Sequence, residues 1–190
     1  MSNVYITKAS TYLPNDPVSN DEMEDYLGLV NDTPSKARAL ILRNNQIKTR
    51  YYALDKNGKP THTNAQITAK AIDGLFDEHF TKEDMELLSC GTTSADQIQP
   101  SHASMVHGEL NIGKSVEINT SMGLCNAGMN ALNYGFLSVK ADVKNNAVCV
   151  GSERFSAWMT ADKFNHEAEN LKLLEERPIV AFKREFLRWM

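Results

Sequence analysis

Short apolar runs that alternate with helix-length segments constrain the fold of this chain most strongly. These runs are rich in β-branched residues and bounded by polar turns, as strands are. They lie at residues 4–6, 87–90, 116–118 and 147–150. Strands separated by helices of about ten or more residues need crossover connections. The pattern therefore predicts an α/β fold with a mixed, mostly parallel sheet of about five strands and flanking helices.

Capping residues and apolar periodicity place helices between these strands. Ser19 and Glu22 have capping-box spacing, and Gly28 is a typical stop residue. Helices are expected over residues 19–28 and 35–43, from a cap at Asn64 to about residue 76, and from Pro100 with Ser101 onward, with a surface turn at residues 56–60.

The composition is that of an acidic globular protein. The 190 residues are 42% apolar and carry a net charge of −4, without a run of Lys or Arg. This balance gives no electrostatic reason to expect nucleic acid or a membrane as a partner. The amino end lacks the apolar stretch of a signal or a membrane span. We expect one cytoplasmic domain over residues 1–190.

The segment SMGLCNAGMNAL at residues 121–132 departs from the regular pattern. It follows a predicted strand and opens a helix whose first residues are unusually small. Small residues permit close backbone contact, so a deeply buried helix is expected. A cysteine at such a start lies near unpaired N–H groups that favour the thiolate and stabilise an oxyanion. Cys125 is therefore a candidate nucleophile for acyl transfer.

A packing role is the alternative for each cysteine. Most intracellular cysteines are small core residues, and position alone favours that interpretation for Cys125. Cys90 and Cys149 lie inside apolar strand runs and are expected to pack. The three spacings match neither a disulfide framework nor a metal site, so no metal or cofactor is expected. Of the five histidines, only His102 and His107 follow a strand-end loop, and none pairs recognisably with Cys125.

Several segments, taken in order, resemble the N-terminal half of the β-ketoacyl-acyl-carrier-protein synthase III family of the thiolase superfamily. The matching segments are YLP at 12–14 with VSN at 18–20, RNNQIKTR at 43–50, GTTS at 91–94 with Pro100, Cys125 at the spacing of the family's active-site cysteine, and VGSE at 150–153. No single motif is decisive, but the ordered set covers about four-fifths of the chain. The segment RNNQIKTRYYALD is more similar to a branch that condenses longer acyl thioesters in resorcinol or aryl-polyene pathways.

This resemblance implies one half of the duplicated thiolase fold and a condensing acyltransferase of fatty acid or polyketide-like biosynthesis. Cys125 would accept an acyl group from acyl-coenzyme A or an acyl carrier protein, and a malonyl-thioester carbanion would attack it. The family's catalytic His and Asn belong to the second half, which we expect to be absent from this chain, since EFLRWM ends it within an apolar pattern. The family's geometry also implies a homodimer through the strand at residues 116–118.

Two further residues are implied in substrate binding by their positions in the motifs. Arg43 matches an arginine that can hold a phosphate of the coenzyme through its bidentate fork. Its alternative is a solvated charge at a helix end. Gln99 stands where relatives often place a Phe that reaches the partner subunit's acyl pocket, and Ala39 replaces a Trp of the coenzyme clamp. The resemblance therefore implies an acyl pocket different from that of an acetyl-selective enzyme.

Three other functions remain open at this point. A half-length chain of this fold can be a non-catalytic partner or scaffold subunit. A hydroxymethylglutaryl-type synthase has a similar fold but needs a glutamate about thirty residues before its cysteine, where this chain has Thr92 and Thr93, with Asp96 nearby. A cysteine hydrolase would need a histidine base against Cys125.

Overall fold

The computed structural model describes residues 3–35, 38–168 and 184–189. Its contacts divide the chain into two compact units. The first unit comprises Met1–Leu13 and His62–Arg154, and the second comprises Pro14–Thr61 and Phe155–Met190. Among the described residues, no helix combines the length and apolarity needed to cross a membrane.

A three-stranded parallel sheet forms the centre of the first unit. Its strands are β4 (Glu117–Ser121), β3 (Leu87–Gly91) and β5 (Val148–Gly151), in that order. The register places Gly91 beside Ser121 on one side and Gly151 on the other. The carboxyl ends of all three strands therefore meet at one edge of the sheet.

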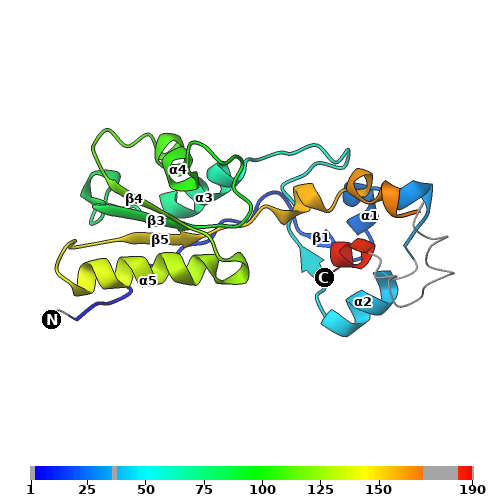
Figure 1. Ribbon diagram of the computed structural model, residues 1–190, viewed down its shortest axis with the longest axis horizontal. Coiled ribbons are helices and arrows are strands. Elements are labelled where there is room, and N and C mark those ends of the chain that lie inside the picture. The colour runs from blue at the N-terminus through cyan, green and yellow to red at the C-terminus, as the bar shows by residue number, and fades with distance from the viewer. Residues whose placement is uncertain (1–2, 36–37, 169–183, 190) are drawn as a thin grey trace. The chain divides into compact units, whose positions relative to one another are not determined.

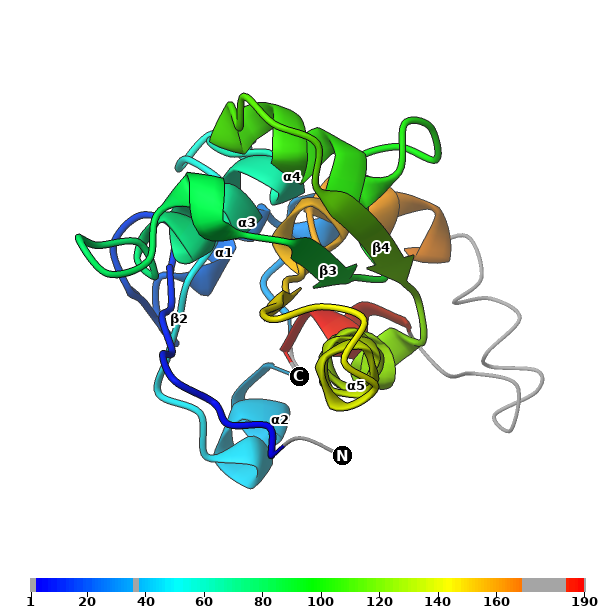
Figure 2. The ribbon, with the colours of Figure 1, turned by 90° about the vertical axis from the view of Figure 1, so that its left-hand side faces the viewer.

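Helices cover both faces of this sheet (Figures 1 and 2). Helices α3 (Asn64–Asp73) and α4 (His102–Leu110) lie on one face, and α5 (Ala127–Lys140) lies on the other. The buried core of this unit gathers residues from the sheet and from α3 and α4: Ala65, Ala69, Ile72, Met85, Leu88, Cys90, Ala103, Val106, Leu110, Ile112 and Val148. The fold class expected from the sequence, a parallel sheet with flanking helices, is confirmed.

Side-chain caps determine where α3 and α4 begin. Thr63 accepts a hydrogen bond from the backbone N–H of Gln66, and the Gln66 side chain accepts one from the Thr63 N–H, which completes a capping box. Ser101 caps α4 in the expected place by accepting from the N–H of Ser104. The cap of α3 is thus one residue earlier than Asn64, because Asn64 already has helical geometry.

The second unit contains a two-stranded antiparallel sheet and two further helices. Strand β1 (Val18–Ser19) pairs with β2 (Thr49–Arg50), while α1 (Met23–Leu27) ends at Gly28 and α2 spans Arg38–Asn45. The buried core of this unit consists of Val18, Met23, Leu27, Leu42, Tyr52, Leu54 and Trp189. Trp189, from the apolar pattern at the end of the sequence, is fully buried there, and Met190 lies outside the described residues.

Two expectations about the strands are wrong. Residues 4–6 form no strand, and Tyr5 and Ile6 are 75% and 80% exposed. A strand needs a hydrogen-bonding partner, and none of the described strands pairs with this run. The strands also do not form a single sheet of about five, since β1 and β2 pair only with each other in the described chain.

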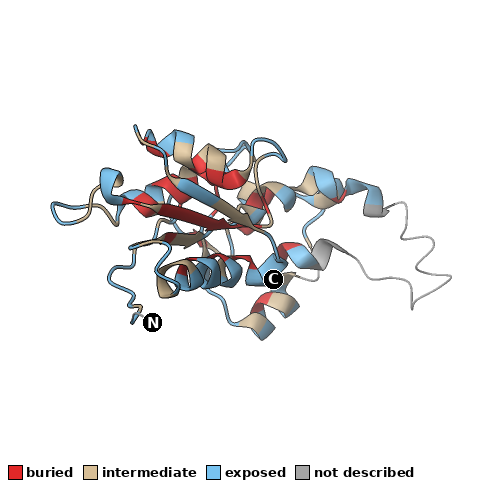
Figure 3. Cartoon of the chain, turned by 60° about the vertical axis from the view of Figure 1, so that its left-hand side comes forward, coloured by how far each residue is buried: buried red, intermediate tan, exposed pale blue. Residues whose placement is uncertain are grey.

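Helix α5 buries only one of its faces. Ala127, Ala131 and Gly135 face the sheet, and α5 packs on β3 and β5. Large apolar side chains away from this face remain exposed: Met129, Leu132, Phe136 and Leu137. Figure 3 shows the central strand β3 in the colour of buried residues and α5 largely in the colours of exposed and intermediate ones. The expected deep burial of this helix is therefore wrong for the described chain.

The difference in burial between the two faces of α5 predicts very different losses of stability for two neighbouring lysine substitutions. Met129 is 60% exposed and Ala131 is 0% exposed. Met129→Lys is expected to change the free energy of unfolding by less than about 0.5 kcal/mol, whereas Ala131→Lys should cost more than about 4 kcal/mol because it buries a charge without a partner. Urea denaturation measures both values, and equal losses would show that the outer face is covered in solution.

Candidate active site

Cys125 lies on the turn that joins β4 to α5. Strand β4 ends at Ser121, a 3₁₀ turn spans Leu124–Asn126, and α5 begins at Ala127. The position of Cys125 just before the helix agrees with the expected strand-to-helix turn. Its side chain is exposed. The thiol is therefore accessible and lies next to the amino end of a 14-residue helix, where N–H groups lack helical partners.

The backbone before Cys125 has an unusual conformation. Gly123 has a φ of 155° and Leu124 a φ of 51°. A left-handed leucine costs roughly 1–2 kcal/mol, so the surrounding contacts must hold it in place. The Asn130 Nδ2 group donates to the carbonyl of Met122 at 3.2 Å, and the Asn126 Nδ2 group donates to Asn130 Oδ1 at 2.9 Å. These two side-chain amides link the turn to the first helical turn of α5 by hydrogen bonds.

Small residues bring the amino end of α5 directly onto the strand ends. A Cβ atom added at Gly91 would stand 2.1 Å from the carbonyl oxygen of Ala127, and one added at Gly151 would stand 3.1 Å from the Cα of Gly128. A side chain at Gly91 would therefore occupy the space of the helix backbone, whereas one at Gly151 would require a smaller shift of the helix. The small residues noted in the sequence thus permit close helix-to-sheet contact, as expected, although the helix as a whole is only half covered.

The other two cysteines are unsuited to nucleophilic chemistry. Cys90 is buried in β3, and burial raises the pKa of its thiol to about 12. Cys149 lies in β5, and burial raises its thiol pKa as well. Both thiols therefore stay protonated at neutral pH. Their packing roles agree with the expectation from the sequence.

Glu153 braces the loop that follows β3. Its carboxylate accepts hydrogen bonds from the backbone N–H groups of Thr93 at 2.8 Å and Ser94 at 3.0 Å, and from the Ser94 hydroxyl at 2.5 Å. The Ser94 hydroxyl oxygen accepts in turn from the backbone N–H of Arg154 at 2.8 Å. The GTTS and VGSE segments are thus joined by hydrogen bonds at the carboxyl edge of the sheet.

Asp96 is fully engaged in a structural role. Its two carboxylate oxygens accept from the backbone N–H groups of Asn64 and Ala65 at 2.8 and 2.9 Å, at the amino end of α3. The Arg154 guanidinium also lies 3.3 Å from Asp96. A carboxylate held in this way is poorly placed to act as a base, which argues against the hydroxymethylglutaryl-type alternative.

His102 belongs to a buried hydroxyl cluster and not to Cys125. Its Nε2 atom lies 3.1 Å from Thr68 Oγ1 and 3.3 Å from Ser152 Oγ, while Nδ1 is buried without a hydrogen-bond partner. Burial lowers the pKa of this imidazole, with Asp96 and Glu153 opposing the shift. Within the described residues, no histidine hydrogen-bonds to Cys125, so the pairing that a cysteine hydrolase needs is not present there.

The other two predicted site residues, Gln99 and Arg43, are both exposed. Gln99 is exposed on the loop before α4 in the first unit, and Arg43 is exposed in the last turn of α2 in the second unit. In the described part of the chain, neither side chain forms a hydrogen bond or an ion pair. Both are therefore free to meet a ligand or solvent.

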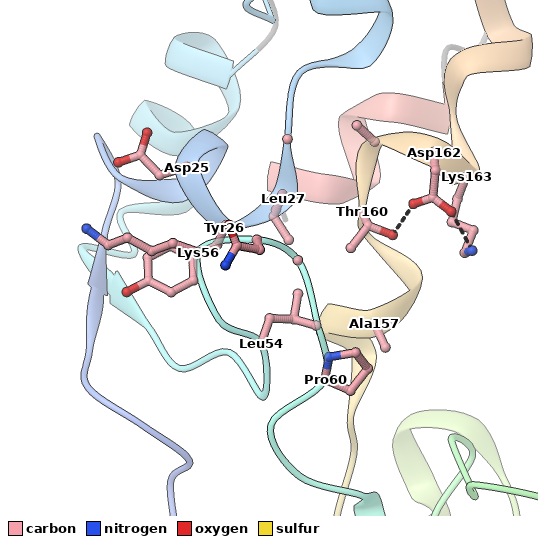
Figure 4. A pocket seen from close by; sticks show the side chains of 14 residues that line it. Asp25, Tyr26, Leu27, Leu54, Lys56, Pro60, Ala157, Thr160, Asp162 and Lys163 are labelled. Atoms are coloured by element: carbon pink, nitrogen blue, oxygen red, sulfur yellow. Dashed lines mark hydrogen bonds and ion pairs between the residues drawn. The ribbon is translucent and has the colours of Figure 1, made fainter.

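A pocket of about 550 Å³ lies wholly within the second unit (Figure 4). The end of α1, the turn at residues 54–60 and residues 157–163 line it. Lys56 lies 5.9 Å from the Tyr26 ring centroid, and Lys163 pairs with Asp162 at 2.6 Å. Acidic and basic groups are both present, so the lining does not select one class of ligand. Sequence analysis did not identify this pocket, because its walls come from three distant segments.

Two curated proteins similar to this chain carry the same name. The β-ketoacyl-[acyl-carrier-protein] synthase III of Clostridium botulinum is 24% identical over 157 residues, which cover 82% of this chain and 44% of that protein. The protein of the same name from Neisseria gonorrhoeae is 28% identical over 151 residues, which cover 80% and 44%. No family model matches the chain. The chain spans less than half the length of these curated relatives.

Three solved structures have a fold similar to that of this chain. The β-ketoacyl-[acyl-carrier-protein] synthase III of Thermus thermophilus has a TM-score of 0.62 at 22% identity, covering 80% of this chain and 43% of its own. A tetronic acid condensing enzyme has a TM-score of 0.66 at 20% identity, covering 87% and 49%. A protein in complex with 3-hydroxy-3-methylglutaryl coenzyme A has a TM-score of 0.55 at 14% identity, covering 72% and 30%. These likenesses confirm the thiolase-like fold and the resemblance to synthase III, and at such identities they concern the fold alone.

The buried imidazole predicts a specific dependence of stability on pH. Because folding lowers the pKa of His102, the unfolded chain binds the proton more readily than the folded chain. The contribution of neutral His102 to the free energy of unfolding is therefore complete above the ordinary histidine pKa of about 6.5. It is lost as the pH falls from there toward the lower pKa of His102 in the folded chain. His102→Gln, which keeps a donor and an acceptor, should flatten this part of the profile measured by urea denaturation.

A second histidine contributes to the same part of the profile. The His62 pKa is also lowered, first by burial and then by Lys70, so some slope should persist in His102→Gln. A wild-type slope that survives in the double variant His62→Gln/His102→Gln would contradict the assignment.

Proposed function

We propose that this chain contributes the acyl-accepting half of a β-ketoacyl-acyl-carrier-protein synthase III-like condensing acyltransferase, with Cys125 as the nucleophile. The observation that carries this proposal is the exposed thiol on the turn between β4 and the amino end of α5. The fold, the ordered motifs and the two named relatives support it. Cys90 and Cys149 offer no competing nucleophile, because burial raises the pKa of both thiols.

In the proposed first step, the Cys125 thiolate attacks the carbonyl carbon of an acyl thioester. The carbonyl electron pair moves to oxygen, and backbone N–H groups around the turn stabilise this oxyanion. The tetrahedral intermediate then expels the thiolate of coenzyme A or of a carrier protein, which takes up a proton. The acyl group is left as a thioester on Cys125.

The second step is a decarboxylating condensation. A malonyl thioester loses carbon dioxide, and the resulting carbanion attacks the acyl carbon and releases the Cys125 thiolate. In the family, a His and an Asn of the second half assist this step. No residue of the described chain is assigned to either role, so we propose that acyl loading and condensation are separable in this protein.

The edge of the sheet supports the proposal of a homodimer. Strand β4 is an edge strand of the described sheet and pairs only with β3. Its outer edge leaves backbone N–H and C=O groups available for a second copy. The side chain of Ile118 on this strand is 40% exposed, which suits a partly apolar interface.

A non-catalytic partner subunit is the second candidate. The exposed apolar side chains on the outer face of α5 favour it, because such a surface normally marks a binding site for another protein or domain. Under this function, α5 would contribute packing alone, and the reactivity of Cys125 would be irrelevant. Acyl transfer to Cys125 distinguishes the two.

Acyl loading on Cys125 gives the direct test of the proposed function. The chain is incubated with a radiolabelled acyl-coenzyme A, and covalently bound label is counted after acid precipitation. We expect label in the wild type and in Cys149→Ala. Label should be lost in Cys125→Ala, and also in the wild type when iodoacetamide alkylates the thiol first. Wild type that takes no label, or Cys125→Ala that keeps it, would support the scaffold function instead.

The role of Arg43 has its own prediction. Arg43→Gln should slow loading from acyl-coenzyme A by about ten- to a hundredfold, because a charge-assisted phosphate contact is worth roughly 1.5–3 kcal/mol. Loading from the corresponding N-acetylcysteamine thioester, which has no phosphate, should be unchanged. Lys48→Gln removes another exposed cation of the second unit and is the control. Equal effects of Arg43→Gln on both donors, or equal effects of the two variants, would contradict phosphate binding.

A further inference from the structure

The contact between the amino end of α5 and the strand ends is made by backbone atoms. Gly91 and Gly151 lie side by side in the register of β3 and β5 and end both strands. Ala127 and Gly128 lie directly on them, two and three residues after Cys125. No side chain separates the helix backbone from the strand backbone at this point.

The two glycines differ in how much space the contact leaves for an added Cβ atom. A Cβ atom at Gly91 would lie 2.1 Å from the Ala127 oxygen, 2.4 Å from its carbonyl carbon and 2.7 Å from the Gly128 nitrogen. All three are backbone atoms, so the first turn of the helix itself would have to move. At Gly151 the nearest atom would be the Cα of Gly128 at 3.1 Å, which a smaller shift relieves.

We propose that Gly91 and Gly151 are positioning residues for Cys125, because they set how closely the amino end of α5 approaches the strand ends and so fix the N–H groups beside the thiol. The inference rests on the proposed function only for its biological use, since the reactivity of the thiol can be measured without any acyl donor. N–H groups at a helix start favour the thiolate, and displacements of about 1 Å at a reacting group can cost about a hundredfold in rate.

The same helix contains a matched control. Gly135 faces the other end of β5, and a Cβ atom there would lie 2.2 Å from Cys149 Sγ and 3.2 Å from Ala147 Cβ. Gly135→Ala therefore introduces a comparable clash under α5, but eight residues after Ala127. It should disturb the surroundings of Cys149 and leave the amino end of the helix in place.

The test measures the rate at which iodoacetamide alkylates each cysteine at neutral pH, followed by peptide mass spectrometry. Gly91→Ala should slow the reaction of Cys125 by about tenfold, because the substitution displaces the N–H groups at the helix start. Gly151→Ala should produce a smaller change in the same direction. Gly135→Ala should speed the reaction of Cys149 and leave the rate at Cys125 unchanged.

These outcomes separate positioning from general loosening of the fold. Loosening leaves an already exposed thiol equally or more accessible, so it does not slow alkylation of Cys125. An unchanged rate of Cys125 alkylation in both Gly91→Ala and Gly151→Ala would overturn the inference, as would an equal slowing by Gly135→Ala. If Gly91→Ala fails to fold, the milder Gly151→Ala decides alone. Failure of acyl loading in the wild type, with the alkylation differences intact, would refute the proposed function and leave this inference standing.

Discussion

The first unit depends on direct contact between the backbone of α5 and the carboxyl ends of β3 and β5. Glycines at the strand ends and small residues in the first turn of the helix remove every side chain from this contact. The helix can therefore begin at the strand edge, and the chain must leave β4 through a tight turn with a left-handed leucine to reach it. Cys125 lies on that turn. Its exposure and its place beside the helix start are consistent with this packing requirement.

A network of polar groups maintains the edge on which this contact is built. Glu153 binds the loop after β3, and Asp96 binds the amino end of α3 and the Arg154 guanidinium. His102 and its two hydroxyl partners join α4, α3 and the end of β5. These hydrogen bonds link the strand ends to the loop and helices around them, which supports a site at that edge.

Local signals in the sequence predicted the parts of the structure that depend on local interactions. Strands β3 and β5, the helix start at Ser101 and the turn before α5 agree closely with their apolar runs and capping residues. Residues 4–6 have the same apolar character yet form no strand, because a strand also needs a partner that the run itself does not specify. The hydrogen bond between Ser94 and Glu153 links residues 59 positions apart. The sequence showed the two family motifs that contain these residues, but not that they contact each other. The expectation that α5 is deeply buried was wrong, because small residues indicate close contact on one face of a helix and do not predict the burial of its other face.

The central claim is that Cys125 carries an acyl thioester. It is tested most directly by mass spectrometry of the peptide that contains residue 125, after incubation of the whole chain with an acyl-coenzyme A and with or without neutral hydroxylamine, which cleaves thioesters. The account predicts an acyl mass increment on that peptide alone, and its removal by hydroxylamine. An unmodified Cys125 peptide, or an increment that resides on Cys90 or Cys149, would contradict it.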